Sequence, residues 1–146
     1  LWDWGSHDVA MCLDLIGHRP ETAIARRIET RDVDNGNGEA LGLVLGFGDV
    51  TAKIAISNLI PEKNRLFTAY LKGGELNYDD TMDDKLRLKI NPQDPGKIVT
   101  LGEAKPLERA VQTFSAAIRK GDADFQDAVL GRDVVAVLEQ LQQHLA

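Results

Sequence analysis

The opening stretch of the chain places apolar side chains at the spacing of an amphipathic helix. They recur with a period near 3.6 residues and therefore share one face. These positions are Val9, Cys12, Leu13 and Ile16. Gly17 and then Pro20 are typical of the point where such a helix ends. The pattern predicts a helix over residues 1–17, anchored on one side in a core.

The middle of the chain changes to a period of two, which is typical of half-buried strands. We expect strands over residues 21–30, 40–48, 50–59, 65–73, 75–80, 85–90 and 97–101. Turn residues cluster at 32–38 and 91–96, and Gly48-Asp49 and Gly73-Gly74 suit tight hairpins. Short loops join neighbouring strands in antiparallel pairs, so the sheet should be mostly antiparallel.

Two helices are predicted after the strands. The first opens at Pro106 and stops at Gly121, and its apolar stripe is Leu107, Ala110, Val111, Phe114, Ala117 and Ile118. A polar link over 122–127 precedes a last helix from about Arg132. Its expected buried side is Val134, Val135, Val137, Leu138, Leu141 and Leu145. The order predicts one α+β domain over 1–146: an open, mostly antiparallel sheet with helices packed on one face.

Composition narrows the class. The 146 residues carry a net charge of -6 and no basic run, which argues against nucleic-acid binding. No run of apolar residues is long enough to cross a membrane. Cys12 is the single cysteine, which favours a reducing compartment, and we expect a cytoplasmic protein in which this thiol is an inert part of the core. Three dispersed histidines predict no metal site.

The opening stretch also holds the best chemical pair. Asp3 and His7 stand four residues apart, on one face of a helix. Histidine titrates near neutrality and suits general acid–base catalysis, and a nearby carboxylate can orient the imidazole. The same pair is also a common helix-surface contact, worth only about 0.2–0.5 kcal/mol. The spacing alone leaves both interpretations open.

Two neighbours of this pair are unusual. Gly5 lies where a helix prefers another residue by about 1 kcal/mol, and close approach of a flat ligand or of another backbone would explain it. Trp2 and Trp4 flank Asp3, and an indole ring can stack on the apolar face of a sugar or pack between domains.

The stretch Asp3-x-Gly5-x-His7-Asp8, followed by a helix that ends at Gly17, resembles the start of the C-terminal domain of the glucose–fructose oxidoreductase and inositol dehydrogenase family (Gfo/Idh/MocA). The later order of strand hairpins, a Pro-Leu helix with an inward Phe114 and a closing helix is similar to that family as well. Members are NAD(P)-dependent oxidoreductases, mostly of sugars and polyols, in which a Rossmann domain precedes this one and binds the nucleotide.

The resemblance implies specific roles. His7 would be the general base, Asp3 would orient it and contact substrate hydroxyls, Trp4 is a candidate sugar contact, and Gly5 could lie close to the nicotinamide. NAD or NADP would be bound mainly by the Rossmann domain, because this sequence contains no Gly-x-Gly-x-x-Gly after a strand. The family's lysine motif is missing too. We therefore expect the sequence to be part of a longer protein and inactive by itself.

Two further expectations follow. The exposed face of the sheet often forms oligomer contacts in this family, and an apolar outer face here favours a homo-oligomer. Some relatives sense ligands or bind proteins instead of turning substrate over. A non-catalytic sensing or interaction module of the same fold is therefore the alternative to a dehydrogenase.

Overall fold

A computed structural model describes residues 1–34, 36–91, 93–102, 106–121 and 126–146. The contacts between Cα atoms divide the chain into two compact units. Unit 1 comprises residues 1–61 and 123–146, and unit 2 comprises residues 62–122. The predicted α+β class is confirmed, but the described strands form two antiparallel sheets where we expected one.

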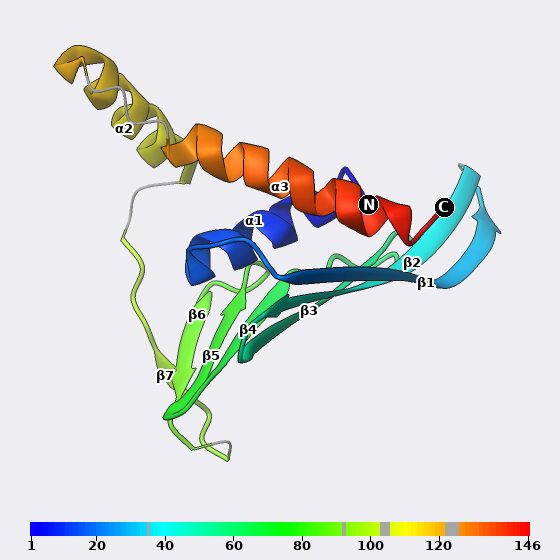
Figure 1. The fold of residues 1–146 in the computed structure, drawn as a ribbon. Helices are drawn as coiled ribbons and strands as arrows, with labels where there is room; N and C mark the ends of the chain where they lie inside the picture. Colours follow the sequence, from blue (N-terminus) through cyan, green and yellow to red (C-terminus); the bar gives the residue numbers. More distant parts are fainter. Residues whose placement is uncertain (35, 92, 103–105, 122–125) are drawn as a thin grey trace. The chain divides into compact units, whose positions relative to one another are not determined.

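Unit 1 is a three-stranded sheet covered by two helices on one face (Figure 1). The strands, in spatial order, are β1 (Thr22–Val33), β2 (Gly36–Phe47) and β3 (Val50–Ser57). The helices are α1 (Gly5–Ile16) and α3 (Gln126–Gln143), which pack against each other and against the sheet. The two ends of the chain therefore build one core together.

The core of unit 1 follows the predicted periodicities. Alternate residues of the central strand β2 point to the helices and are almost fully buried: Leu41, Leu43, Leu45 and Phe47. The apolar stripe of α1 is buried as predicted at Val9, Cys12 and Leu13, whereas Ile16 is half-buried. On α3 the buried side is confirmed at Val134, Val137, Leu138 and Leu141, and Leu145 is buried just beyond the helix.

The first hairpin is longer than the turn residues suggested. β2 begins at Gly36 rather than near residue 40, and pairing continues to Val33 opposite Gly36. Glycine accepts the positive φ of 121° that Gly36 adopts at this end. Of the predicted turn, residue 35 lies outside the described residues. The predicted Gly48-Asp49 hairpin is confirmed, with Gly48 at a φ of 61° between β2 and β3.

Unit 2 contains the other four strands and one helix. The strands are β4 (Leu66–Leu71), β5 (Gly74–Asp79), β6 (Leu86–Lys89) and β7 (Lys97–Ile98), each antiparallel to its neighbours in this order. The helix is α2 (Pro106–Lys120). The predicted hairpin around Gly73-Gly74 is confirmed. Every buried apolar residue of the described chain lies in unit 1, so the described apolar residues of unit 2 are half-buried or exposed.

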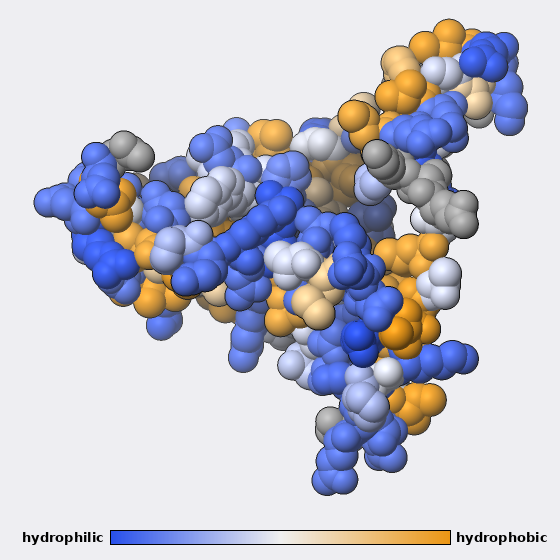
Figure 2. Space-filling view, turned by 180° about the vertical axis from the view of Figure 1, so that it is seen from behind, coloured by the Kyte–Doolittle hydropathy of each residue, from blue (hydrophilic) through white to orange (hydrophobic). Residues whose placement is uncertain are grey.

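Three details of the helices differ from the prediction. α3 begins at Gln126, earlier than expected, so the link over 122–127 is partly helical, and residues 122–125 lie outside the described part. Val135 points outward and is 46% exposed, because it stands one position from the buried Val134 on the helix. Phe114 of α2 is 68% exposed rather than inward. Figure 2 shows apolar surface over α2, and none of its described side chains is buried.

We expect α2 to be the least protected helix of this chain. A helix of this length without packing is marginal in water, because tertiary contacts supply most helical stability. Backbone amides of α2 should exchange with deuterium about 100-fold faster than those of α3, after correction for intrinsic rates. Mass spectrometry of peptides from the two helices measures this ratio. Equal protection would mean that a partner covers the α2 stripe in solution.

No helix in the described ranges has both the length and the apolar character that a membrane span needs.

Candidate functional site

The candidate pair lies where the chain enters its first helix. α1 begins at Gly5, and Asp3 lies in the preceding turn. The prediction that Asp3 and His7 share one face of a helix is therefore wrong. Trp4 occupies the N-cap position, and its side chain makes no capping hydrogen bond. An indole has no acceptor for a backbone N–H as Ser or Asp has, so no side-chain cap satisfies the first N–H groups of the helix. One backbone hydrogen bond, from the Gly5 N–H to the Leu1 carbonyl (2.9 Å), closes the turn that precedes the helix.

His7 stands in the first turn of α1 and is exposed to solvent, as is Asp3. Within the described residues, no hydrogen bond or ion pair joins the Asp3 carboxylate to the His7 imidazole. The backbone N–H of His7 donates to the Trp4 carbonyl at 3.3 Å. Because Val9, Cys12 and Leu13 are buried, the exposed imidazole is carried by a helix firmly anchored in the core.

Gly5 has a reason within the fold. It is buried, and a Cβ added to it would lie 3.3 Å from the Cδ1 atoms of both Leu1 and Ile56. The start of α1 therefore approaches β3 more closely than a side chain at this position would comfortably permit. Packing accounts for the glycine without a ligand, and its suggested proximity to a nicotinamide stays a prediction.

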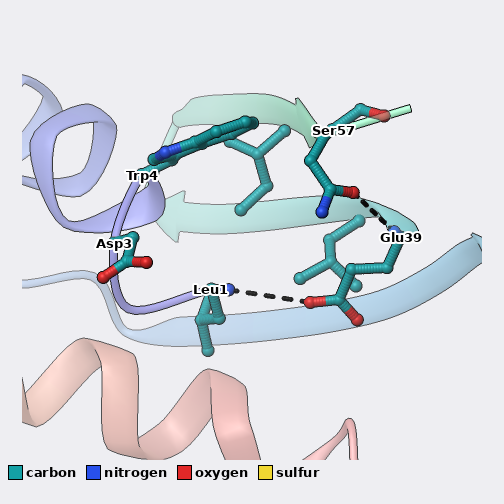
Figure 3. Close-up of a pocket in the computed structure, with 8 residues that line it drawn as sticks. Leu1, Asp3, Trp4, Glu39 and Ser57 are labelled. Atoms are coloured by element: carbon teal, nitrogen blue, oxygen red, sulfur yellow. Dashed lines mark hydrogen bonds and ion pairs between the residues drawn. The ribbon is translucent and has the colours of Figure 1, made fainter. Parts of the chain in front are cut away.

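A hollow of about 190 Å³ opens beside this turn (Figure 3). Asp3 and Trp4 line it from the turn, Glu39 and Leu41 from β2, and Ser57 and Asn58 from the end of β3. Figure 3 shows Trp4 on one side of the hollow and Leu1 with Glu39 on the other. His7 is not part of its lining. Of the residues predicted for the site, the structure thus brings Asp3 and Trp4 together at the hollow and leaves His7 on the neighbouring helical turn.

Two polar residues of the hollow are held in place by a short network. The Glu39 backbone N–H donates to Asn58 Oδ1 at 2.6 Å, and the Asn58 N–H donates to the Glu39 carbonyl at 3.2 Å. Arg27 donates through Nε to Glu39 Oε2 at 3.5 Å and through a terminal nitrogen to the Leu145 carbonyl at 3.2 Å. In addition, the Leu1 ammonium lies 3.8 Å from Glu39 Oε1. The residues that surround the hollow are therefore held by bonds to β1, β2, β3 and the C-terminal end of the chain.

Sequence reasoning missed Glu39 and Asn58. A signal for Glu39 was present, because it continues the inward register of Leu41, Leu43 and Leu45 and is therefore a charged residue on the core side of a strand. Asn58 gave no comparable signal, since an asparagine after a strand is ordinary turn chemistry. Only the fold brings it against Glu39.

Cys12 is confirmed as a core residue, with 5% of its surface exposed. Burial, together with the nearby negative charge of Asp8, raises the pKa of the Cys12 thiol to about 11. The thiolate is the reactive form, and a raised pKa suppresses it at all pH values below about 11. This thiol has the character of a packing group.

We expect Cys12 to resist alkylation in the folded protein. At pH 8, iodoacetamide should modify it at least about 100-fold more slowly than it modifies the denatured chain, because the native thiol is both buried and protonated. Mass spectrometry against time, with and without denaturant, gives the two rates. Labelling at similar rates would contradict a buried, inert thiol.

Two aspartates of the acidic stretch at residues 79–84 accept internal hydrogen bonds. Asp79 accepts hydrogen bonds from the Thr81 hydroxyl (2.6 Å) and N–H (2.9 Å), which lower the pKa of its carboxyl. Lys85 Nζ lies 2.7 Å from Asp80 Oδ1, and this bond, followed by that of Tyr78, lowers the pKa of Asp80. Among the residues that the structure describes, no group of three or more His, Cys, Asp or Glu could hold a metal ion.

Comparisons with known proteins point to a shared fold. The chain is 34% identical to a proposed oxidoreductase from Magnetospirillum magnetotacticum MS-1, with a TM-score of 0.83 over 96% of this chain and 47% of the other. It also matches the fold of yvaA, a proposed oxidoreductase from Bacillus subtilis, at 18% identity and a TM-score of 0.73, over 98% of this chain and 49% of the other. No protein-family model and no curated protein matches. The chain spans about half the length of both solved structures.

Proposed function

We propose that this chain is the substrate-binding, C-terminal domain of an NAD(P)-dependent oxidoreductase of the Gfo/Idh/MocA type, acting on a hydroxyl group of a sugar, polyol or related compound. The observation that carries the proposal is the exposed His7 imidazole, fixed on an anchored helix next to a polar hollow lined by Asp3 and Trp4. The likeness to a proposed oxidoreductase at 34% identity over 96% of this chain supports the broader class, an oxidoreductase.

The proposed reaction converts a CH–OH group into a carbonyl. His7 would accept the hydroxyl proton on an imidazole nitrogen, and Asp3 would bind neighbouring hydroxyls of the substrate. The nicotinamide supplies the acceptor for the hydride that leaves the same carbon. Because this sequence contains no Gly-x-Gly-x-x-Gly after a strand, the proposal assigns the nucleotide to a preceding Rossmann domain.

The test uses the full-length protein with NAD⁺ or NADP⁺ and a panel of neutral sugars and polyols. Formation of reduced nicotinamide with at least one of them is the expected result, and the 146-residue chain alone should give none. Binding of the nucleotide and of a sugar without any turnover would favour the sensing module instead. The observation that favours this alternative is that no bond joins Asp3 to His7 among the described residues.

We also propose that the open face of the β1–β3 sheet is buried against a second copy of the protein. Ile24, Ile28 and Val44 are exposed there, beside a shallow hollow of about 340 Å³ over Gly42. Burying such apolar side chains stabilises an assembly by about 25 cal/mol per Å² removed from water. Sedimentation at micromolar concentration should therefore show a dimer or larger species, and a monomer alone would contradict this part of the proposal.

A further inference from the structure

Polar side chains share the lining of the hollow beside Trp4 with apolar ones. Two carboxylates, Asp3 and Glu39, and one amide, Asn58, stand at its wall, and Leu41 lies buried beneath. Carboxylate oxygens only accept hydrogen bonds, whereas an amide nitrogen donates. Hydroxyl groups can do both, so a compound with several hydroxyls satisfies all three residues at once.

The orientation of the Asn58 amide follows from its neighbour. Because the Glu39 backbone N–H donates at 2.6 Å, the atom facing it must be the carbonyl oxygen Oδ1. The amide nitrogen Nδ2 is then free to serve as a donor, and it has no hydrogen-bond partner among the described residues. The same holds there for the Asp3 carboxylate and for the indole nitrogen of Trp4. These groups are in contact with solvent now and could bind a ligand without breaking an internal bond.

Two cations lie near the Glu39 carboxylate. Arg27 lies 3.5 Å from its Oε2 atom and is itself held by the Leu145 carbonyl. Arg27 is not part of the lining of the hollow. The Leu1 ammonium, 3.8 Å from Oε1, is the other nearby cation, and it would be a neutral peptide nitrogen if Leu1 followed another residue. The face that the hollow then offers to a ligand is negative, from Asp3 and Glu39.

From this geometry we infer that the hollow selects hydroxyl-rich ligands that are neutral or cationic and rejects anionic ones, with Glu39 and Asn58 as the residues that determine this specificity. The inference rests on the proposed function and deepens it, because Asp3 belongs to both. The Trp4 ring, 53% exposed, offers its flat face to the apolar side of a sugar ring. A carboxylate or phosphate on the ligand would instead meet the like charges of Asp3 and Glu39, and with Leu1 joined to a preceding residue the lining holds no cation to compensate.

The experiment compares three probes that share one ring and differ in charge: glucose, glucosamine and glucuronate. Calorimetric titration of the full-length protein, without oxidised cofactor, measures binding separately from turnover. Glucuronate should bind at least about tenfold more weakly than glucose, and glucosamine at least as tightly as glucose. Glucuronate binding as well as glucose, or no binding of any of the three, would overturn the inference.

Two variants locate the effect. Glu39→Gln keeps the side-chain shape and removes the charge. It should therefore narrow the gap, meaning the ratio of the affinities for glucose and glucuronate, to about threefold or less. Asn58→Asp keeps the acceptor for the Glu39 N–H but replaces the donor with a negative charge, and it should widen the gap. The matched control is Glu29→Gln on β1, an exposed glutamate paired with Arg31 outside the hollow, which should leave the gap unchanged.

Thermal unfolding of each variant checks that it remains folded. A folded Glu39→Gln protein that keeps the wild-type gap would refute the role of Glu39, whatever the outcome for catalysis. Conversely, selective binding that depends on Glu39, in a protein that never reduces NAD(P)⁺, would sustain this inference while the proposed oxidoreductase activity fails. The two proposals can therefore fail separately.

Discussion

Replacing His7 by alanine in the full-length protein is expected to lower kcat by about 10²–10⁴-fold, the range that a positioned general acid or base contributes. The imidazole is exposed on the first turn of α1, while Val9, Cys12 and Leu13 anchor the helix from its other side. Removing the side chain therefore deletes the proton acceptor without disturbing the core. Steady-state kinetics with the best substrate of the panel measures the loss.

The pattern of kinetic constants distinguishes chemistry from binding. Because His7 does not line the hollow, we expect the affinity for the sugar to change much less than kcat. The control is His144→Ala, which removes another exposed histidine at the end of the chain and should leave both constants within about twofold. Turnover by the His7 variant within about twofold of the wild type would exclude the imidazole as general base.

Truncating Leu43 should have the largest effect on stability. This side chain is 1% exposed at the centre of β2, between β1 and β3 and beneath the helices. Leu43→Ala removes buried methyl groups and leaves a cavity that a central strand cannot easily close. We expect the free energy of unfolding to fall by about 2–5 kcal/mol. Urea denaturation followed by circular dichroism measures it.

The matched control for this variant is Leu15→Ala on α1. Leu15 is 63% exposed, so the same chemical change should alter the free energy of unfolding by only about 0.5 kcal/mol or less. Similar losses for both variants would mean that the face of the sheet covered by α1 and α3 is not the core of unit 1.

Much of the fold could be read from periodicity. The period of two predicted the strand that became β2, and the period of 3.6 along α3 predicted its buried residues except Val135, because burial on one side of an element imposes its geometric repeat on the sequence. The prediction was less complete for α2. Its stripe from Leu107 to Ile118 indicated a helix correctly, but Phe114 points to solvent because amphipathicity does not specify what covers the apolar face.

The candidate site was predicted only in part. The motif from Asp3 to His7 identified the right corner of the molecule, yet the helix starts too late to place both residues on one of its faces. Asp3 lies in the turn before the helix, and Gly5, the first helical residue, lies close to Ile56. The spacing of two residues along the sequence predicts their relative orientation only within a regular helix or strand, and not across the point where that element begins or ends.

By itself, the sequence determined the class of the fold, most of the buried side of α3, and the position of one histidine on an anchored helix. Tertiary structure alone decided that Glu39 and Asn58 meet beside Trp4, through bonds between residues far apart along the chain. The physical reason is that the periodicity of apolar residues indicates which face of each helix or strand is buried. The grouping of polar side chains into a site depends on how the ends of different elements come together, and no local pattern encodes that.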